Sequence, residues 1–201
     1  LTDTPRANRL HIAFYGRRNA GKSSLINMVT AQQTALVSAY AGTTTDPVVK
    51  SMELLPLGPL AVIDTAGLDD SGELGALRIE RSKEMMDRTD MALLVVAADQ
   101  AADLSFEKEW LAELRGRRIT VAGVLNQIDK IAEGGAEKCR AALEGELGIP
   151  FTAVSALDKK YRAALLASIV KNAPTDFEAP TLTGDLFTPG DTVVLVAPQD
   201  I

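Results

Sequence analysis

The sequence lacks several features that define protein classes. Cysteine occurs once, at Cys139, which excludes an intrachain disulfide and a metal site built from cysteines alone. We interpret Cys139 as a partly buried small apolar residue on a helix. No apolar run reaches the ~18 residues of a membrane-spanning helix, and residues 1–6 have no signal-peptide apolar core. We therefore expect a cytoplasmic protein with no membrane partner.

Negative charge outnumbers positive charge in this sequence. The chain has 21 Lys and Arg residues against 27 Asp and Glu residues, a net charge of −6 and a pI near 4.9. Because no extensive basic face is available, we expect no nucleic-acid partner as the main activity. The composition, 46% hydrophobic and 24% charged residues, is that of a soluble globular protein.

The clearest motif lies at residues 16–23, which fit the pattern G-x-x-x-x-G-K-S. It follows an apolar stretch, residues 10–15, and precedes a helix-like stretch from Lys22. This strand–loop–helix context is typical of a phosphate-binding loop, whose N–H groups and helix start face an anion. Lys22 can reach the β- and γ-phosphates, and the Ser23 hydroxyl can ligate Mg²⁺. The alternative is a glycine-rich turn that matches by chance.

Two further stretches complete a phosphate and magnesium site. Asp64 ends an apolar strand, where its carboxylate can hold the Mg²⁺ shell, through water. The Gly67 N–H can meet the γ-phosphate, because glycine allows close backbone approach. Thr44 lies in a loop rich in small and hydroxyl residues and is the candidate second side-chain ligand of Mg²⁺. Thr43 and Thr45 remain alternatives.

A second pair of motifs indicates which base is bound. Residues 126–129, Asn-Gln-Ile-Asp, follow a buried strand, and residues 155–157, Ser-Ala-Leu, follow the next one. Asp129 can accept hydrogen bonds from N1 and N2 of guanine, which adenine cannot donate. Asn126 can tie this loop to the phosphate loop and reach N7, and a backbone N–H of residues 155–157 can donate to O6. The order of these motifs predicts a guanine-nucleotide-binding domain.

Alternating strand and helix patterns predict an α/β fold. Strands are expected at 10–15, 48–55, 60–64, 91–97, 119–125 and 151–154, and helices at 22–31, 76–87, 103–115, 134–146 and 160–171. The prediction is a mostly parallel six-stranded sheet with helices on both faces and an antiparallel edge strand from the 48–63 hairpin. We expect a leader at 1–9, a nucleotide-binding domain at 10–173, and a linker with the start of a truncated second domain at 174–201.

Over residues 10–172 these motifs resemble the Ras-like P-loop GTPases. Asn19, Leu68 and residues 42–44 resemble the branch activated by a monovalent cation, which includes GTPases of tRNA modification and ribosome assembly. More narrowly, four stretches resemble the HydF family, the GTPases that help mature FeFe-hydrogenases. These stretches are residues 42–47, 52–59, 63–75 and 182–191.

The resemblance implies slow, K⁺-stimulated GTP hydrolysis used as a switch during assembly of the hydrogenase active-site cluster. Its implied cofactors are GTP or GDP, Mg²⁺ held by Ser23, Thr44 and Asp64, and K⁺ held by Asn19. Lys22, Thr44, Gly67 and Asn19 are the implied catalytic residues. The implied nucleotide contacts are Gly16, Asn19, Ala20, Gly21, Lys22, Ser23, Ser24, Thr43, Thr44, Asp64, Gly67, Asn126, Gln127, Asp129, Ser155, Ala156 and Leu157.

The implied partners are a second copy of the chain, other hydrogenase maturation proteins and the apo-hydrogenase. Residues 174–201 would then begin a dimerisation domain, and a 4Fe–4S cluster is expected only in a C-terminal domain that this chain lacks. Two alternatives stay open: a cation-activated GTPase of tRNA modification or ribosome assembly, and a GTP-sensing scaffold with incidental hydrolysis.

The sequence departs from the family pattern at two places. Gln127 replaces the lysine of the usual N-K-x-D motif, and residues 158–161 run straight into a helix where the family usually has a glycine-bearing loop. Leu68, in addition, stands where Ras-like enzymes carry the glutamine that orients the attacking water.

No arginine finger is obvious. Arg17 and Arg18 could touch the phosphates, but we expect their side chains to point to solvent, because the loop works through its backbone. His11, at the opposite end of its strand, is expected to be structural or solvated.

Overall fold

The computed structural model describes residues 9–30, 48–65, 73–132 and 134–174. The predictions for the leader, for residues 31–47 and 66–72, and for the segment after Pro174 lie outside the described residues. Among these predictions are the roles of Thr43, Thr44, Gly67 and Leu68 and the proposed start of a dimerisation domain.

The strands of the described residues form one six-stranded sheet in the order β2-β3-β1-β4-β5-β6. Only β2 runs antiparallel to its neighbour, so the predicted mostly parallel sheet with one antiparallel edge strand is confirmed. The strands are β1 (Leu10–Gly16), β2 (Val48–Leu54), β3 (Gly58–Asp64), β4 (Met91–Ala97), β5 (Thr120–Asn126) and β6 (Phe151–Ala153).

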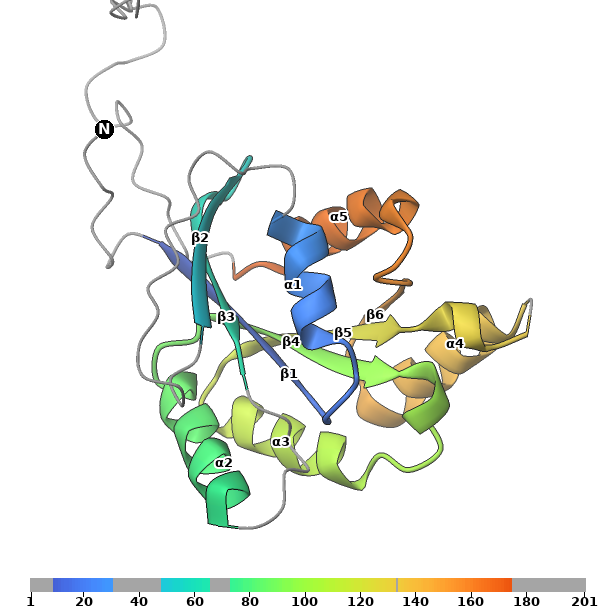
Figure 1. Cartoon of the computed structure of the whole chain (residues 1–201), viewed down its shortest axis with the longest axis horizontal. Helices are drawn as coiled ribbons and strands as arrows, with labels where there is room; N and C mark the ends of the chain where they lie inside the picture. The colour runs from blue at the N-terminus through green and yellow to red at the C-terminus, as the bar shows by residue number, and fades with distance from the viewer. Residues whose placement is uncertain (1–8, 31–47, 66–72, 133, 175–201) are drawn as a thin grey trace, which may run out of the picture.

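Helices cover both faces of this sheet, as predicted (Figure 1). They are α1 (Lys22–Thr30), α2 (Glu73–Met86), α3 (Ser105–Gly116), α4 (Gly135–Leu147) and α5 (Arg162–Asn172). Helices α1 and α5 pack on one face, and α2, α3 and α4 pack on the other. The last helix starts two residues later than expected, because Lys159–Tyr161 form a 3₁₀ turn whose Lys160 N–H is capped by Asp158.

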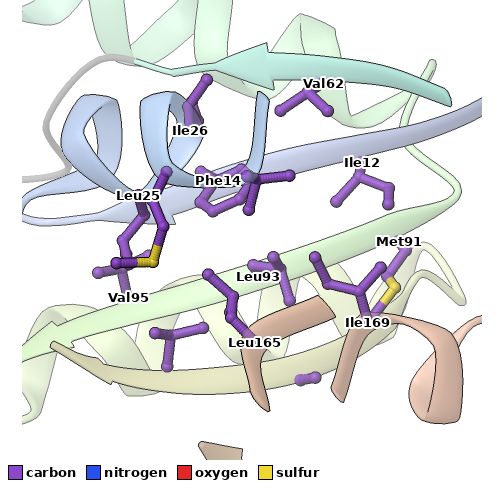
Figure 2. Close-up of a cluster of buried hydrophobic side chains, with 14 of the residues drawn as sticks. Ile12, Phe14, Leu25, Ile26, Val62, Met91, Leu93, Val95, Leu165 and Ile169 are labelled. Carbon is purple, nitrogen blue, oxygen red and sulfur yellow. The ribbon is translucent and has the colours of Figure 1, made fainter. Parts of the chain in front are cut away.

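Alternation along the central strands builds a separate core on each face. Ile12 and Phe14 of β1 face α1 and α5, where they pack with Leu25 and Leu165 (Figure 2). Tyr15 faces the other way, and its ring lies 5.7 Å from that of Trp110 on α3. Each fully buried large side chain contributes roughly 1.5–3 kcal/mol to folding, so these two cores hold the sheet rigid.

The order of the strands places the site. Strand β1 lies between β3 and β4, and the chain crosses from one side of it to the other between β3 and β4. Ligands of such sheets bind at the carboxyl ends of the strands, next to the position where the strand order reverses. The segments that follow β1, β3, β5 and β6 all leave from this edge, because these strands run parallel.

Candidate functional site

The loop from β1 to α1 needs its two motif glycines for close packing as well as for backbone freedom. A Cβ atom at Gly16 would lie 2.4 Å from the Val95 carbonyl oxygen of β4. Gly21 has a φ of +90°, and a Cβ there would lie 2.3 Å from the Asn126 side chain. Neither position accepts a side chain without a shift of its neighbours, so the fold itself demands these residues.

Lys22 begins α1 and is almost completely buried. Its Nζ atom donates to the carbonyl oxygens of Gly16 at 2.9 Å and Arg17 at 3.1 Å. The ammonium group therefore lies across the loop, above the N-terminal end of α1. A positive charge and a helix N-terminus in one loop form an environment that favours phosphate.

Ser23 and Asp64 meet at the mouth of this loop. The Ser23 hydroxyl donates to the Asp64 carboxylate at 2.5 Å, although the two residues come from different elements. Pairing of β3 with β1 places Asp64 beside Phe14, and the buried Thr65 hydroxyl donates to the Phe14 carbonyl at 2.6 Å. Hydroxyl and carboxylate oxygens are ligands that Mg²⁺ prefers, so this donor set fits the predicted metal.

Asn126 connects the phosphate loop to the segment after β6. Its side chain is buried, its Nδ2 donates to the Ala20 carbonyl at 2.9 Å, and its Oδ1 accepts from the Ala156 N–H at 3.1 Å. The predicted tie to the phosphate loop is therefore present. The Ala156 N–H has a protein partner here, so donation by this group to guanine O6 requires an exchange of partners.

Asp129 is held by Ser155. The buried Ser155 hydroxyl donates to Asp129 Oδ1 at 2.5 Å, and Asp129 itself is exposed on the 3₁₀ turn Ile128–Lys130. One carboxylate oxygen is thus oriented by the protein, while the group remains accessible from outside. Leu157, the last residue of the predicted base-contacting segment, is 84% exposed.

Gln127 replaces the usual lysine and still reaches the phosphate loop. Its Nε2 donates to the Asn19 carbonyl at 2.8 Å, while its Oε1 is buried without a hydrogen-bond partner. Gln127 and Asn19 both adopt left-handed backbone conformations, with φ of +62° and +61°. Arg118, before β5, has a similar φ of +60°, so this backbone conformation alone does not identify the site; the contact between Gln127 and Asn19 joins the two motif loops.

The prediction that Arg17 points to solvent is wrong. Its guanidinium forms an ion pair with Glu107 of α3, a carboxylate that is completely buried. Glu107 was missed at the sequence level, although a signal exists. It occupies the apolar stripe of α3, three residues after Leu104 and four before Leu111, where a lone charge implies a buried partner. Arg18, in contrast, is exposed as expected.

His11 lies at the opposite end of β1 and serves structure. Its backbone N–H donates to the Asp90 carboxylate at 2.8 Å, and its Nδ1 lies 3.3 Å from the same oxygen. Burial alone would raise the pKa of Asp90, but the hydrogen bonds from His11 outweigh it and leave the pKa below its usual value. This pair joins the start of β4 to β1, away from the site.

In the described segments no helix is long and apolar enough to cross a membrane.

A family model described as "50S ribosome-binding GTPase" matches residues 11–127. The chain is 32% identical over 155 residues to the tRNA modification GTPase MnmE of Desulfotalea psychrophila, covering 77% of this chain and 32% of that protein. It is 35% identical over 130 residues to the GTPase Der of Sulfurimonas denitrificans, covering 63% and 26%.

Solved structures show the same fold. Aquifex aeolicus Era bound to GDP and AlF4⁻ superposes with a TM-score of 0.66 at 23% identity, covering 82% of this chain and 56% of that chain. The G domain of the T. maritima FeoB iron transporter gives a TM-score of 0.58 at 23% identity, covering 82% and 98%. The chain spans about a quarter to a third of the length of these two curated relatives.

Proposed function

The chain belongs to the 50S ribosome-binding GTPase family, and we propose that its site binds guanine nucleotide with Mg²⁺ and hydrolyses GTP as a switch. The observation that carries this proposal is the Asn126 side chain, which joins the phosphate loop at Ala20 to the segment at Ala156. Phosphate-binding and base-binding groups thereby form one continuous site.

Each part of the site has a definite task. Lys22 and the N–H groups of the loop bind the phosphates, and Asp129, oriented by Ser155, accepts from the guanine edge. Ser23 and Asp64 would hold Mg²⁺, with Thr44 as a further ligand. When bound, the metal neutralises charge on the phosphate oxygens. Leu68 has no hydrogen-bonding side chain to orient water, and the sequence shows no obvious arginine finger. We therefore assign the positive charge that offsets the phosphates to K⁺, which Asn19 would hold.

The cellular role has two candidates. The similarity to MnmE and Der supports a cation-activated GTPase of tRNA modification or ribosome assembly. The resemblance of residues 42–47, 52–59, 63–75 and 182–191 to the HydF family supports hydrogenase maturation, with a homodimer and the apo-hydrogenase as partners. The expectation of no nucleic-acid partner has no support from the similar structures, because one of them is Era bound to 16S ribosomal RNA.

Turnover of the purified chain tests the proposed chemistry. We expect phosphate release from GTP with Mg²⁺, none from ATP, and loss of most turnover in Lys22→Ala, because the phosphates lose a positive charge. Near-normal turnover in Lys22→Ala, or equal use of ATP, contradicts the assignment. Complementation with the complete gene separates the cellular roles: restored hydrogenase activity in a maturation mutant supports one, and restored tRNA modification in an MnmE mutant supports the other.

A further inference from the structure

We propose that Arg17 is a positioning residue whose ion pair with Glu107 holds the phosphate loop in its nucleotide-binding shape. We call this pair the α3 latch. The inference rests on the proposed function, because it assigns to the latch a role in nucleotide affinity. It differs from the usual role of an arginine in such a site, since Arg17 acts through the loop and not on the phosphates.

The latch has the geometry of a strong ion pair. Arg17 Nε lies 2.9 Å from Glu107 Oε1, and Arg17 Nη2 lies 3.0 Å from Oε2, so both carboxylate oxygens are engaged. The guanidinium also donates to the Asp103 carbonyl and lies 4.9 Å from the ring centre of Phe106. Paired, planar contacts of this kind fix the position and the orientation of the arginine.

Burial makes the latch hard to open. The Glu107 side chain is 1% exposed and that of Arg17 is 13% exposed. A carboxylate in such a place is costly without its partner, so the arginine cannot leave without stranding a buried charge. The guanidinium is therefore committed to α3, which removes Arg17 as an arginine finger in this arrangement.

The backbone of Arg17 transmits this restraint to the loop. Its carbonyl oxygen accepts from Lys22 Nζ at 3.1 Å and from the Ala20 N–H at 3.3 Å. Fixing the side chain of Arg17 thus also fixes the peptide group whose carbonyl oxygen accepts from Lys22. A second side chain also restrains the phosphate loop: Gln100 Nε2 donates to the Arg18 carbonyl at 3.4 Å.

A preformed loop increases affinity for every ligand that needs its shape. If the loop without the Arg17–Glu107 ion pair adopts its nucleotide-binding shape only about one-tenth of the time, the apparent affinity for nucleotide falls about tenfold. The loss should be equal for GDP and GTP, because the loop binds both. Uniform loss of binding raises KM and leaves kcat unchanged.

The test uses the 201-residue chain with Arg17→Ala, Glu107→Gln and the double variant. The double variant removes both charges of the pair, so that no unpaired charge stays buried. Lys108→Ala is the matched control, because it removes a positive charge from the next position of α3, where Lys108 pairs with Glu146 in an exposed bridge. GDP binding is measured by calorimetry and GTP turnover by phosphate release. Thermal unfolding without nucleotide monitors the fold.

We expect the double variant to weaken GDP binding and raise KM about tenfold, with kcat within about twofold and Lys108→Ala at the wild-type values. Arg17→Lys should fall between, because one ammonium cannot engage both oxygens. Wild-type affinity in the double variant, even with lowered thermal stability, overturns the latch, as does a fall in kcat at constant KM. A wild-type chain that binds no GDP overturns the proposed function itself.

Discussion

The hydroxyl of Ser23 donates a hydrogen bond of 2.5 Å to the carboxylate of Asp64. The first residue belongs to the opening turn of α1 and the second to the end of β3, so the contact joins the phosphate loop to the neighbouring strand. A hydroxyl oxygen and a carboxylate oxygen therefore lie together at a site that is partly open to solvent. Mg²⁺ prefers oxygen ligands of these kinds, which supports the proposal that the metal binds here.

Ser23→Ala should lower GTP turnover at saturating nucleotide by at least ~100-fold at low Mg²⁺, because a metal ligand is lost. A Mg²⁺ titration of phosphate release measures the effect, and removal of Mg²⁺ with EDTA should reduce the wild type to the same level. The control is Ser51→Ala on the edge strand β2, which removes a hydroxyl that accepts a hydrogen bond from Arg9. An unchanged Mg²⁺ titration in Ser23→Ala would remove Ser23 from the metal site.

Asp129→Asn should exchange GTP for xanthosine triphosphate, with a loss of GTP affinity of at least ~100-fold. The amide oxygen can still accept from the Ser155 hydroxyl, which directs the amide N–H groups to the base. The amide of the Asp129→Asn variant then presents an N–H group to the base. Guanine needs an acceptor at this place, whereas xanthine has an additional carbonyl oxygen that can accept from the amide. Competition binding with the two triphosphates gives the answer, and retention of GTP preference would refute the assigned role.

Asn126→Ala should weaken GDP and GTP binding together and destabilise the fold. Two hydrogen bonds of a buried amide disappear, at a cost of roughly 1–3 kcal/mol for each group left without a partner. Asn126→Asp should resemble Asn126→Ala, because a carboxylate cannot donate to the Ala20 carbonyl. Denaturant unfolding and GDP calorimetry measure the two effects. Wild-type stability in both variants would show that the bridge contributes nothing.

Potassium should raise GTP turnover at least about tenfold over sodium at matched ionic strength, with NH₄⁺ and Rb⁺ as substitutes. The reason is that K⁺ carries the unit charge of an arginine finger, a group worth roughly 10³–10⁵ in rate. Equal rates in KCl and NaCl would discard the mechanism.

Asn19→Ala should remove this cation dependence while GDP affinity stays nearly intact. Because Asn19 has a φ of +61°, alanine strains the backbone by roughly 1–2 kcal/mol. Asn19→Gly is therefore the better variant, since it deletes the amide and keeps the loop conformation. If the potassium effect is lost in Asn19→Ala but kept in Asn19→Gly, the loss is caused by backbone strain and not by removal of the amide.

Much of this protein could be predicted from local sequence. The strand and helix patterns predicted the mostly parallel sheet, and the spacing of residues 16–23 predicted a strand, a loop and a helix that begins at Lys22. Asp64 and Asn126 end β3 and β5, and Ser155 follows β6, so the three residues lie at one edge because these strands run parallel. Such inferences succeed because the periodicity of burial and the shape of a short loop depend on neighbouring residues.

Only the tertiary structure decided which distant residues meet. The order of the strands, the contact of Gly16 with Val95 and the pairing of Arg17 with Glu107, 90 residues apart, have no local pattern. Arg17 was misassigned to solvent because a phosphate loop works through its backbone, which favoured an outward side chain. Its true position follows from the burial of Glu107 inside α3: an isolated buried charge requires a partner, and only the packing of α3 beside the phosphate loop brings that partner within reach.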